Sequence, residues 1–161
     1  MRAKLLKFAR LALPLSAALA LASCSWITDL VVLNRSTERV VVEYTFKEKQ
    51  ERGRACCPGG GVPSKKALKD VKDDGVGWSV LAEDEYSYDA AVGRVTVMLR
   101  AGEALRVMRA LNYMGREDAE DPDFALKSIS LTGAKGTIYL EGLQAQTAFR
   151  EESNDLYTLT Y

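Results

Sequence analysis

The chain has 161 residues, with 22 Lys and Arg, 22 Asp and Glu, and no His. This length fits one domain of ordinary size, and the even charge balance argues against a protein built mainly to hold nucleic acid. The lack of His removes the commonest general base and the commonest metal ligand. We therefore predict a protein that is not an enzyme and has no metal site, no cofactor and no nucleic-acid partner.

The first 23 residues have the layout of an export signal. Basic residues precede an apolar run of Leu and Ala, Leu11–Ala22, that only Pro14 and Ser16 interrupt. Such signals are removed from the mature protein. One alternative is an uncleaved transmembrane helix, for which the strongly apolar part is too short. The other is ordinary cleavage that leaves Cys24 free, but the three residues directly before Cys24 are not an Ala-x-Ala site.

The segment Leu21-Ala22-Ser23-Cys24 resembles the lipobox of bacterial lipoproteins. The resemblance implies that diacylglycerol is attached to the sulfur of Cys24 and that cleavage makes Cys24 the first residue of the mature chain. Several acyl chains hold a protein firmly on a membrane, because each buried CH₂ contributes about 0.8 kcal/mol. The resemblance also implies an outer-membrane location, on the periplasmic face, because Ser25 stands where Asp would retain a lipoprotein in the inner membrane. Residues 24–28 are then a lipidated tether.

Residues 29–161 are expected to form a single domain made of β-strands. Apolar and polar residues alternate in many short segments, and turn residues such as Gly, Asn and Asp separate them. This pattern favours an antiparallel β-sandwich, immunoglobulin-like or similar, of about eight strands, with a small barrel as the alternative. The main predicted strands cover residues 30–32, 40–46, 95–99, 105–107, 129–131, 138–140, 143–149 and 156–161.

Four turns and one helix complete this prediction. The turn at residues 34–37 predicts a first hairpin between the strands at 30–32 and 40–46, and further turns fall at 101–103, 133–136 and 151–154. At most one short helix is expected. Ser64 could cap it, an apolar face would include Leu68 and Val71, and Gly75 would end it.

Two loops carry uneven charge. The loop at residues 47–72 contains eight Lys and Arg against three acids, so it is expected to be basic. It could dock on anionic lipid or on an acidic envelope protein, since each cation near such a surface contributes about 1 kcal/mol, or it could simply be solvated. Residues 117–123 hold five acids, but they lack the spacing of a calcium loop, so we expect a solvated loop.

Cys56 and Cys57 are neighbours within the basic loop. In an oxidising compartment they are candidates for a local disulfide, which would be strained because adjacent Cα atoms lie only about 3.8 Å apart. A strained bridge is easily reduced, so a redox role is one interpretation, and capture of a thiophilic metal is another. A bridge with no function, or a bond between two chains, is the third. Structural zinc is not expected, because two thiolates supply half of its ligands.

Motifs for catalysis are lacking: the chain has no Gly-x-Ser-x-Gly elbow and no phosphate-binding Gly-rich loop. The sequence predicts a lipid-anchored cell-envelope protein that acts as a non-enzymatic binding or accessory module at the outer membrane. The alternative is a thiol-based redox or metal-handling lipoprotein that uses Cys56 and Cys57. A small hydrolase with paired carboxylates is a third hypothesis, for which the acids at 83–89 are the candidates.

Overall fold

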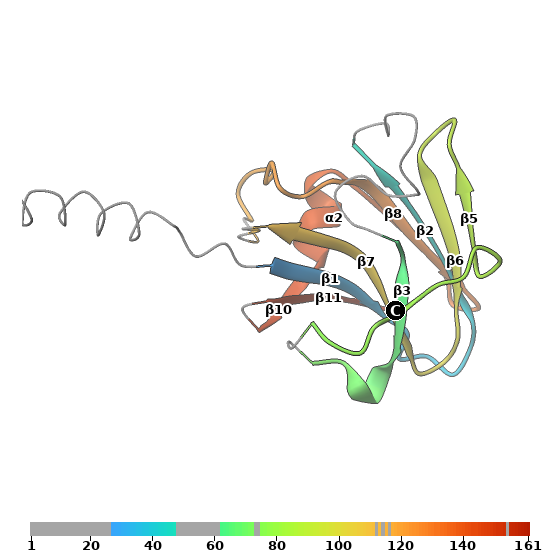
Figure 1. Cartoon of the computed structure of the whole chain (residues 1–161). Coiled ribbons are helices and arrows are strands. Elements are labelled where there is room, and N and C mark those ends of the chain that lie inside the picture. The colour runs from blue at the N-terminus through green and yellow to red at the C-terminus, as the bar shows by residue number, and fades with distance from the viewer. Residues whose placement is uncertain are drawn as a thin grey trace, which may run out of the picture.

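Two β-sheets pack face to face and enclose the main core (Figure 1). The structure is a computed structural model that describes residues 27–47, 62–72, 75–111, 113, 115, 117–153 and 155–161. Cys24, Cys56 and Cys57 lie outside the described residues. The described elements are β1 (Ile27–Leu33), β2 (Val40–Phe46), β3 (Ser64–Ala67), the 3₁₀-helix η1 (Leu68–Asp70), β4 (Ser79–Val80), β5 (Tyr86–Asp89), β6 (Arg94–Leu99), β7 (Glu103–Leu111), β8 (Leu126–Gly133), β9 (Gly136–Glu141), α2 (Leu143–Ala148), β10 (Arg150–Ser153) and β11 (Leu156–Thr160).

The six-stranded sheet has the order β10-β11-β1-β7-β3-β4, and the five-stranded sheet has the order β5-β6-β2-β8-β9. The predicted mostly β, sandwich-like architecture is therefore confirmed. Strand pairing is antiparallel except between β1 and β11, which run parallel, so the expectation of a purely antiparallel fold is wrong in one pair. The described residues form eleven strands rather than about eight, because short edge strands such as β4 and β10 escape periodicity.

Alternation places one face of each central strand in the core. In β2 the residues at 40, 42, 44 and 46 are buried, while those between them are partly exposed. The same period of two holds in β6, whose residues 95, 97 and 99 are buried, and in β8, where 129 and 131 are buried. The hairpin between β8 and β9, predicted from the turn at 133–136, is present in the register Gly133 to Gly136. Together these residues confirm the predicted inward faces.

The predicted hairpin between residues 30–32 and 40–46 is wrong, because β1 and β2 belong to different sheets. The chain crosses between the layers here and again between β6 and β7. Asn34 joins the two crossings: its side-chain amide donates to the carbonyls of Glu38 (2.7 Å) and Leu99 (3.2 Å). Its backbone carbonyl accepts a hydrogen bond from the N–H of Gly102. The buried Asn34 side chain thus supplies hydrogen bonds to two backbone carbonyls, at Glu38 and Leu99, where the chain leaves regular strand pairing.

Two predictions of secondary structure are also wrong. The helix expected from Ser64 is strand β3 followed by the single turn η1, because residues 64–67 pair with β7. The strand expected at 143–149 is instead α2 up to Ala148. Gln146 links this helix to the acidic loop. It is buried on the inner face of α2, where its side chain accepts from the backbone N–H of Asp121 and donates to the carbonyl of Ala119.

These bonds fix the acidic loop at 117–123. Glu117 and Asp118 are exposed, as expected of a solvated loop, whereas Asp121 is buried. A carboxylate oxygen of Asp121 accepts from the backbone N–H of Asp123. The prediction of a solvated loop therefore holds for most of these residues and fails at Asp121, whose backbone N–H is bonded to Gln146 of α2.

Tyr44 supplies a test of the core. Its hydroxyl is buried and has no hydrogen-bond partner, and burial, with a smaller effect of Tyr86, raises the pKa of Tyr44 above its ordinary value. Tyr44→Phe should raise the free energy of unfolding by about 1 kcal/mol at neutral pH, because a buried hydroxyl without a partner is costly. Urea unfolding measures this, with the exposed Tyr139→Phe as the control. A Tyr44→Phe variant that is less stable than the wild type by about that amount would contradict the assignment.

The same variant should respond less to alkali. In the folded protein Tyr44 keeps its proton above pH 10, whereas the unfolded chain releases it, so the wild-type free energy of unfolding falls as pH rises above 10. Tyr44→Phe removes this contribution, so its stability should decline less steeply over that range.

Candidate functional site

Strand β1 is buried on both faces, which is unusual for a sheet of a small sandwich. Its inner residues, including Leu30, join the main core, while Val31 and Leu33 form a second cluster on the outer face. Residues 68–72 and 75–80, which we call the strap, cover this outer face with Leu68 and Trp78 and form the green ribbon beside β1 in Figure 1. Any polar residue under the strap must therefore find a partner within the protein.

Asp29 is that polar residue. Its carboxylate accepts from Nε of Arg109 at 2.8 Å and from Nη1 of Arg106 at 3.3 Å. A β-bulge in β7, opposite Leu30 and Val31, makes this arrangement possible, because it brings Arg106 and Arg109 to the same face although they are three residues apart. Burial lowers the pKa of Arg106 from its ordinary value, and the Asp29 charge opposes that shift. The Arg106 guanidinium stays charged, because arginine keeps its proton in proteins.

The strap is attached to this cluster. Arg109 also donates to the carbonyl of Gly75 at 3.4 Å, and Lys66 donates to that of Val76 at 2.6 Å. The guanidinium of Arg106 lies 5.1 Å from the ring centre of Trp78, within the range of a cation–π contact. These contacts hold the strap on the sheet.

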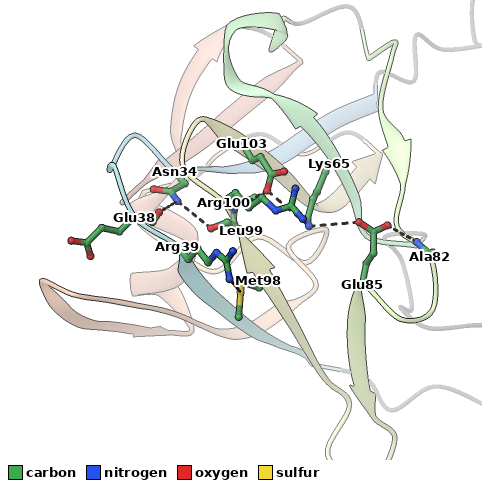
Figure 2. Close-up of polar contacts among 10 residues, drawn as sticks. All are labelled: Asn34, Glu38, Arg39, Lys65, Ala82, Glu85, Met98, Leu99, Arg100 and Glu103. Carbon is green, nitrogen blue, oxygen red and sulfur yellow. Dashed lines mark hydrogen bonds and ion pairs between the residues drawn. The ribbon is translucent and has the colours of Figure 1, made fainter.

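Other lysines of the predicted basic loop also have partners within the chain. Figure 2 shows Lys65 between Glu85 and Glu103, with its ammonium 3.9 Å from each carboxylate. Lys47 pairs with Glu120 at 2.9 Å. The two acids beside Lys65 are themselves held by backbone N–H groups. The described part of the loop is thus less available to an outside anion than its charge count predicts.

A polar pocket of about 100 Å³ lies beside the acidic loop. It contains two carboxylates, Glu117 and Glu151, which makes it relevant to the hypothesis of a hydrolase. The carboxylate of Glu117 lies 3.5 Å from Arg150, and both side chains are largely exposed. Burial, together with the charge of Glu151 and a hydrogen bond to it, raises the pKa of Tyr157. Among the described residues that line the pocket, both carboxylates, Glu117 and Glu151, are exposed.

Strand β9, at the edge of the five-stranded sheet, is largely exposed. Five of the six β9 residues are exposed, and they include Ile138 and Tyr139, which are 41% and 59% exposed. On the outer face Tyr139 donates to the carboxylate of Glu141 at 3.1 Å, and Thr137 is bonded to Thr132 of β8. Because β9 is the last strand of its sheet, one side of its backbone has no neighbouring strand among the described residues.

Tyr161 braces the start of this edge. Its hydroxyl donates to the carbonyl of Gly136 at 3.2 Å, and its backbone N–H bonds to the carbonyl of Leu33. Its ring lies against Gly133, where a Cβ atom would stand only 2.7 Å from the Tyr161 hydroxyl. A pocket of about 180 Å³ opens between the two segments and is lined by Lys135, Gly136, Thr137, Ile138, Thr160 and Tyr161. An exposed strand edge and a neighbouring pocket together form a surface suited to an extended chain.

The site residues predicted from the sequence, all of them cysteines, are not part of this described surface. Cys24, Cys56 and Cys57 lie outside the described residues. Within the described ranges, no three acidic or thiol side chains gather to hold a metal ion. In the same ranges, no helix is long and apolar enough to cross a membrane. A signal for the β9 edge was present in the sequence, since residues 136–140 carry no charge, but the edge position itself depends on which strands pair.

Comparison with protein-family models, with known proteins and with solved structures gives no match to this chain.

The contact between Gly133 and Tyr161 gives a test of the braced hairpin. Gly133→Ala should displace the Tyr161 ring and lower the free energy of unfolding by about 1–2 kcal/mol, because overpacking at a close contact costs that much. Urea unfolding measures it. The control is a double-mutant cycle: with Tyr161→Ala already present, Gly133→Ala should cost nothing further. Equal costs in both backgrounds would contradict the contact.

Proposed function

We propose that the mature protein is a lipid-anchored, non-enzymatic binding module at the outer membrane, and that the β9 edge with its pocket is the binding surface. One observation carries the binding part of this proposal: β9 is an edge strand with five exposed residues, among them Ile138 and Tyr139. Such edges bind extended segments through main-chain hydrogen bonds, and adjacent pockets select side chains.

The lipobox resemblance supports the anchoring part. Acylation of Cys24 would leave a tether of three peptide steps before β1, at most about 10 Å long, so the domain would sit against the membrane. A tethered module meets its partners at a raised effective concentration, so even a modest contact area can be sufficient. The immunoglobulin-like form of the sandwich and the thiol-based alternative at Cys56 and Cys57 stay predictions.

The anchor is tested by the intact mass of the membrane-extracted protein. We expect a chain that begins at Cys24 and carries added acyl mass. Cys24→Ala should retain residues 1–23 and lack that mass, whereas the control, Cys56→Ala with Cys57→Ala, should be acylated like the wild type. An unacylated wild-type chain would contradict the lipoprotein interpretation.

The binding surface is tested with a photoreactive side chain in place of Tyr139 in living cells. We expect a crosslinked adduct on illumination, and no adduct from the same group at Val92, which is similarly exposed on the turn between β5 and β6. Adding Ile138→Lys should remove the adduct by placing a charge on the edge, while Met98→Lys, on the outer face of the same sheet, should leave it. No adduct at position 139 would contradict binding at β9.

A further inference from the structure

We propose that the partner at the β9 edge is a second copy of this chain, paired antiparallel with the first about a two-fold axis at Ile138. The inference rests on the proposed binding surface and names its occupant. It would join two five-stranded sheets into one continuous sheet. Three observations support it: the contrast with the other edges, the hydrogen-bonding pattern of β9, and the order of its side chains.

The other three sheet edges of the described fold are protected against pairing. Strand β4 has two residues and β5 has four, so each offers few main-chain groups. Strand β10 begins with Arg150, Glu151 and Glu152, and self-pairing would bring the acids of two copies together. Short length and charge are the usual protections of an edge. β9 is longer, with six residues, and its only charged residue is Glu141 at its end.

The hairpin geometry decides which backbone groups of β9 are available. Gly133 and Gly136 close a two-residue turn, so they form a hydrogen-bonded pair, and such pairs alternate along an antiparallel ladder. Ile138 and Leu140 therefore direct their N–H and C=O groups toward β8. Thr137, Tyr139 and Glu141 direct theirs outward, where a second strand can bond to them.

A two-fold axis that joins two antiparallel strands places one residue opposite itself. With Ile138 at the axis, the two Ile138 side chains meet, and Thr137 faces Tyr139 of the second copy. Lys135, in the turn just before the strand, then lies at the same end as Glu141 of the second copy, within reach of its carboxylate, and the symmetry repeats this pair. Opposite charges across antiparallel strands are stabilising, and no like charges face each other in this register. Residues 135–141 thus carry a positive charge at one end and a negative charge at the other, and antiparallel pairing of two copies brings these opposite charges together.

The contact is small, because a single strand pair buries less than the roughly 1,600 Å² of a standard interface. The dimer is therefore expected to be weak in dilute solution and populated on a membrane, where tethering raises the effective concentration of both copies. Experiments should use the full acylated chain in its membrane.

The first test replaces Ile138 with Cys in a chain where Cys56 and Cys57 are replaced by Ser. A residue on the axis lies about 4.5–5.5 Å from its copy, within reach of a disulfide. We expect a disulfide-linked dimer on a non-reducing gel after mild oxidation of the membranes. Met98→Cys is the matched control, equally exposed on the same sheet but away from the edge, and it should give none.

The second test reverses the charges in the Ile138→Cys background. Lys135→Glu or Glu141→Lys alone should reduce the crosslinked fraction by about fivefold, because each places like charges opposite each other twice. Producing the two single variants together should restore crosslinking between them, since each then supplies the charge that the other needs. Restoration also shows that both variants are folded.

The outcomes separate this inference from the proposed function. If Ile138→Cys gives no dimer while the photoreactive group at position 139 crosslinks another protein, the second copy is excluded as the occupant and the binding surface stands. If neither experiment gives an adduct, both proposals fail. A dimer at Ile138→Cys that ignores both charge reversals would overturn the register.

Discussion

Burial of β1 on both faces is the constraint on which the rest of the structure depends. Six of its seven residues are buried, and β1 lies between β11 and β7 in the centre of the six-stranded sheet. A strand in that position needs an apolar cover on each side. The five-stranded sheet covers one side, and the strap covers the other through Leu68 and Trp78. The strap exists because β1 presents Val31 and Leu33 outward.

Asp29 is connected to the strap through Arg106 and Arg109, which hold the strap in place on the sheet. A carboxylate under the strap would be costly without partners, and the bulge in β7 supplies two of them on one face. The same Arg side chains then reach the strap, through the carbonyl of Gly75 and the ring of Trp78. The bulge therefore lets one buried carboxylate contact both Arg106 and Arg109, and these two side chains connect it to the strap. The strap thus covers the outer face of the six-stranded sheet at β1.

Strand periodicity predicted most of the elements but not their partners. Alternation in β2, β6 and β8 located their inner faces, because a period of two follows from the pleat alone. Which strands share a sheet depends on contacts distant in sequence, so the hairpin proposed across Asn34 became a crossing between layers. The unbroken apolar run at 30–33 was a signal of burial on both faces. Local spacing at 64–71 suggested a helix, but the edge of β7 bound that segment as a strand. The hairpin that contains β9 could be predicted from its glycines, whereas its edge position could not.

The four sheet edges of the described fold differ in how well they are protected against pairing. Edge strands are a hazard in water, and this protein protects three of its four described edges by short length or by charge. The fourth, β9, is longer, uncharged over five residues, largely exposed, and held at its first residue by the hydroxyl of Tyr161. An unprotected edge costs solubility unless another strand covers it. Its retention beside three protected edges therefore favours a surface that pairs, and its self-complementary charges favour another copy as the partner.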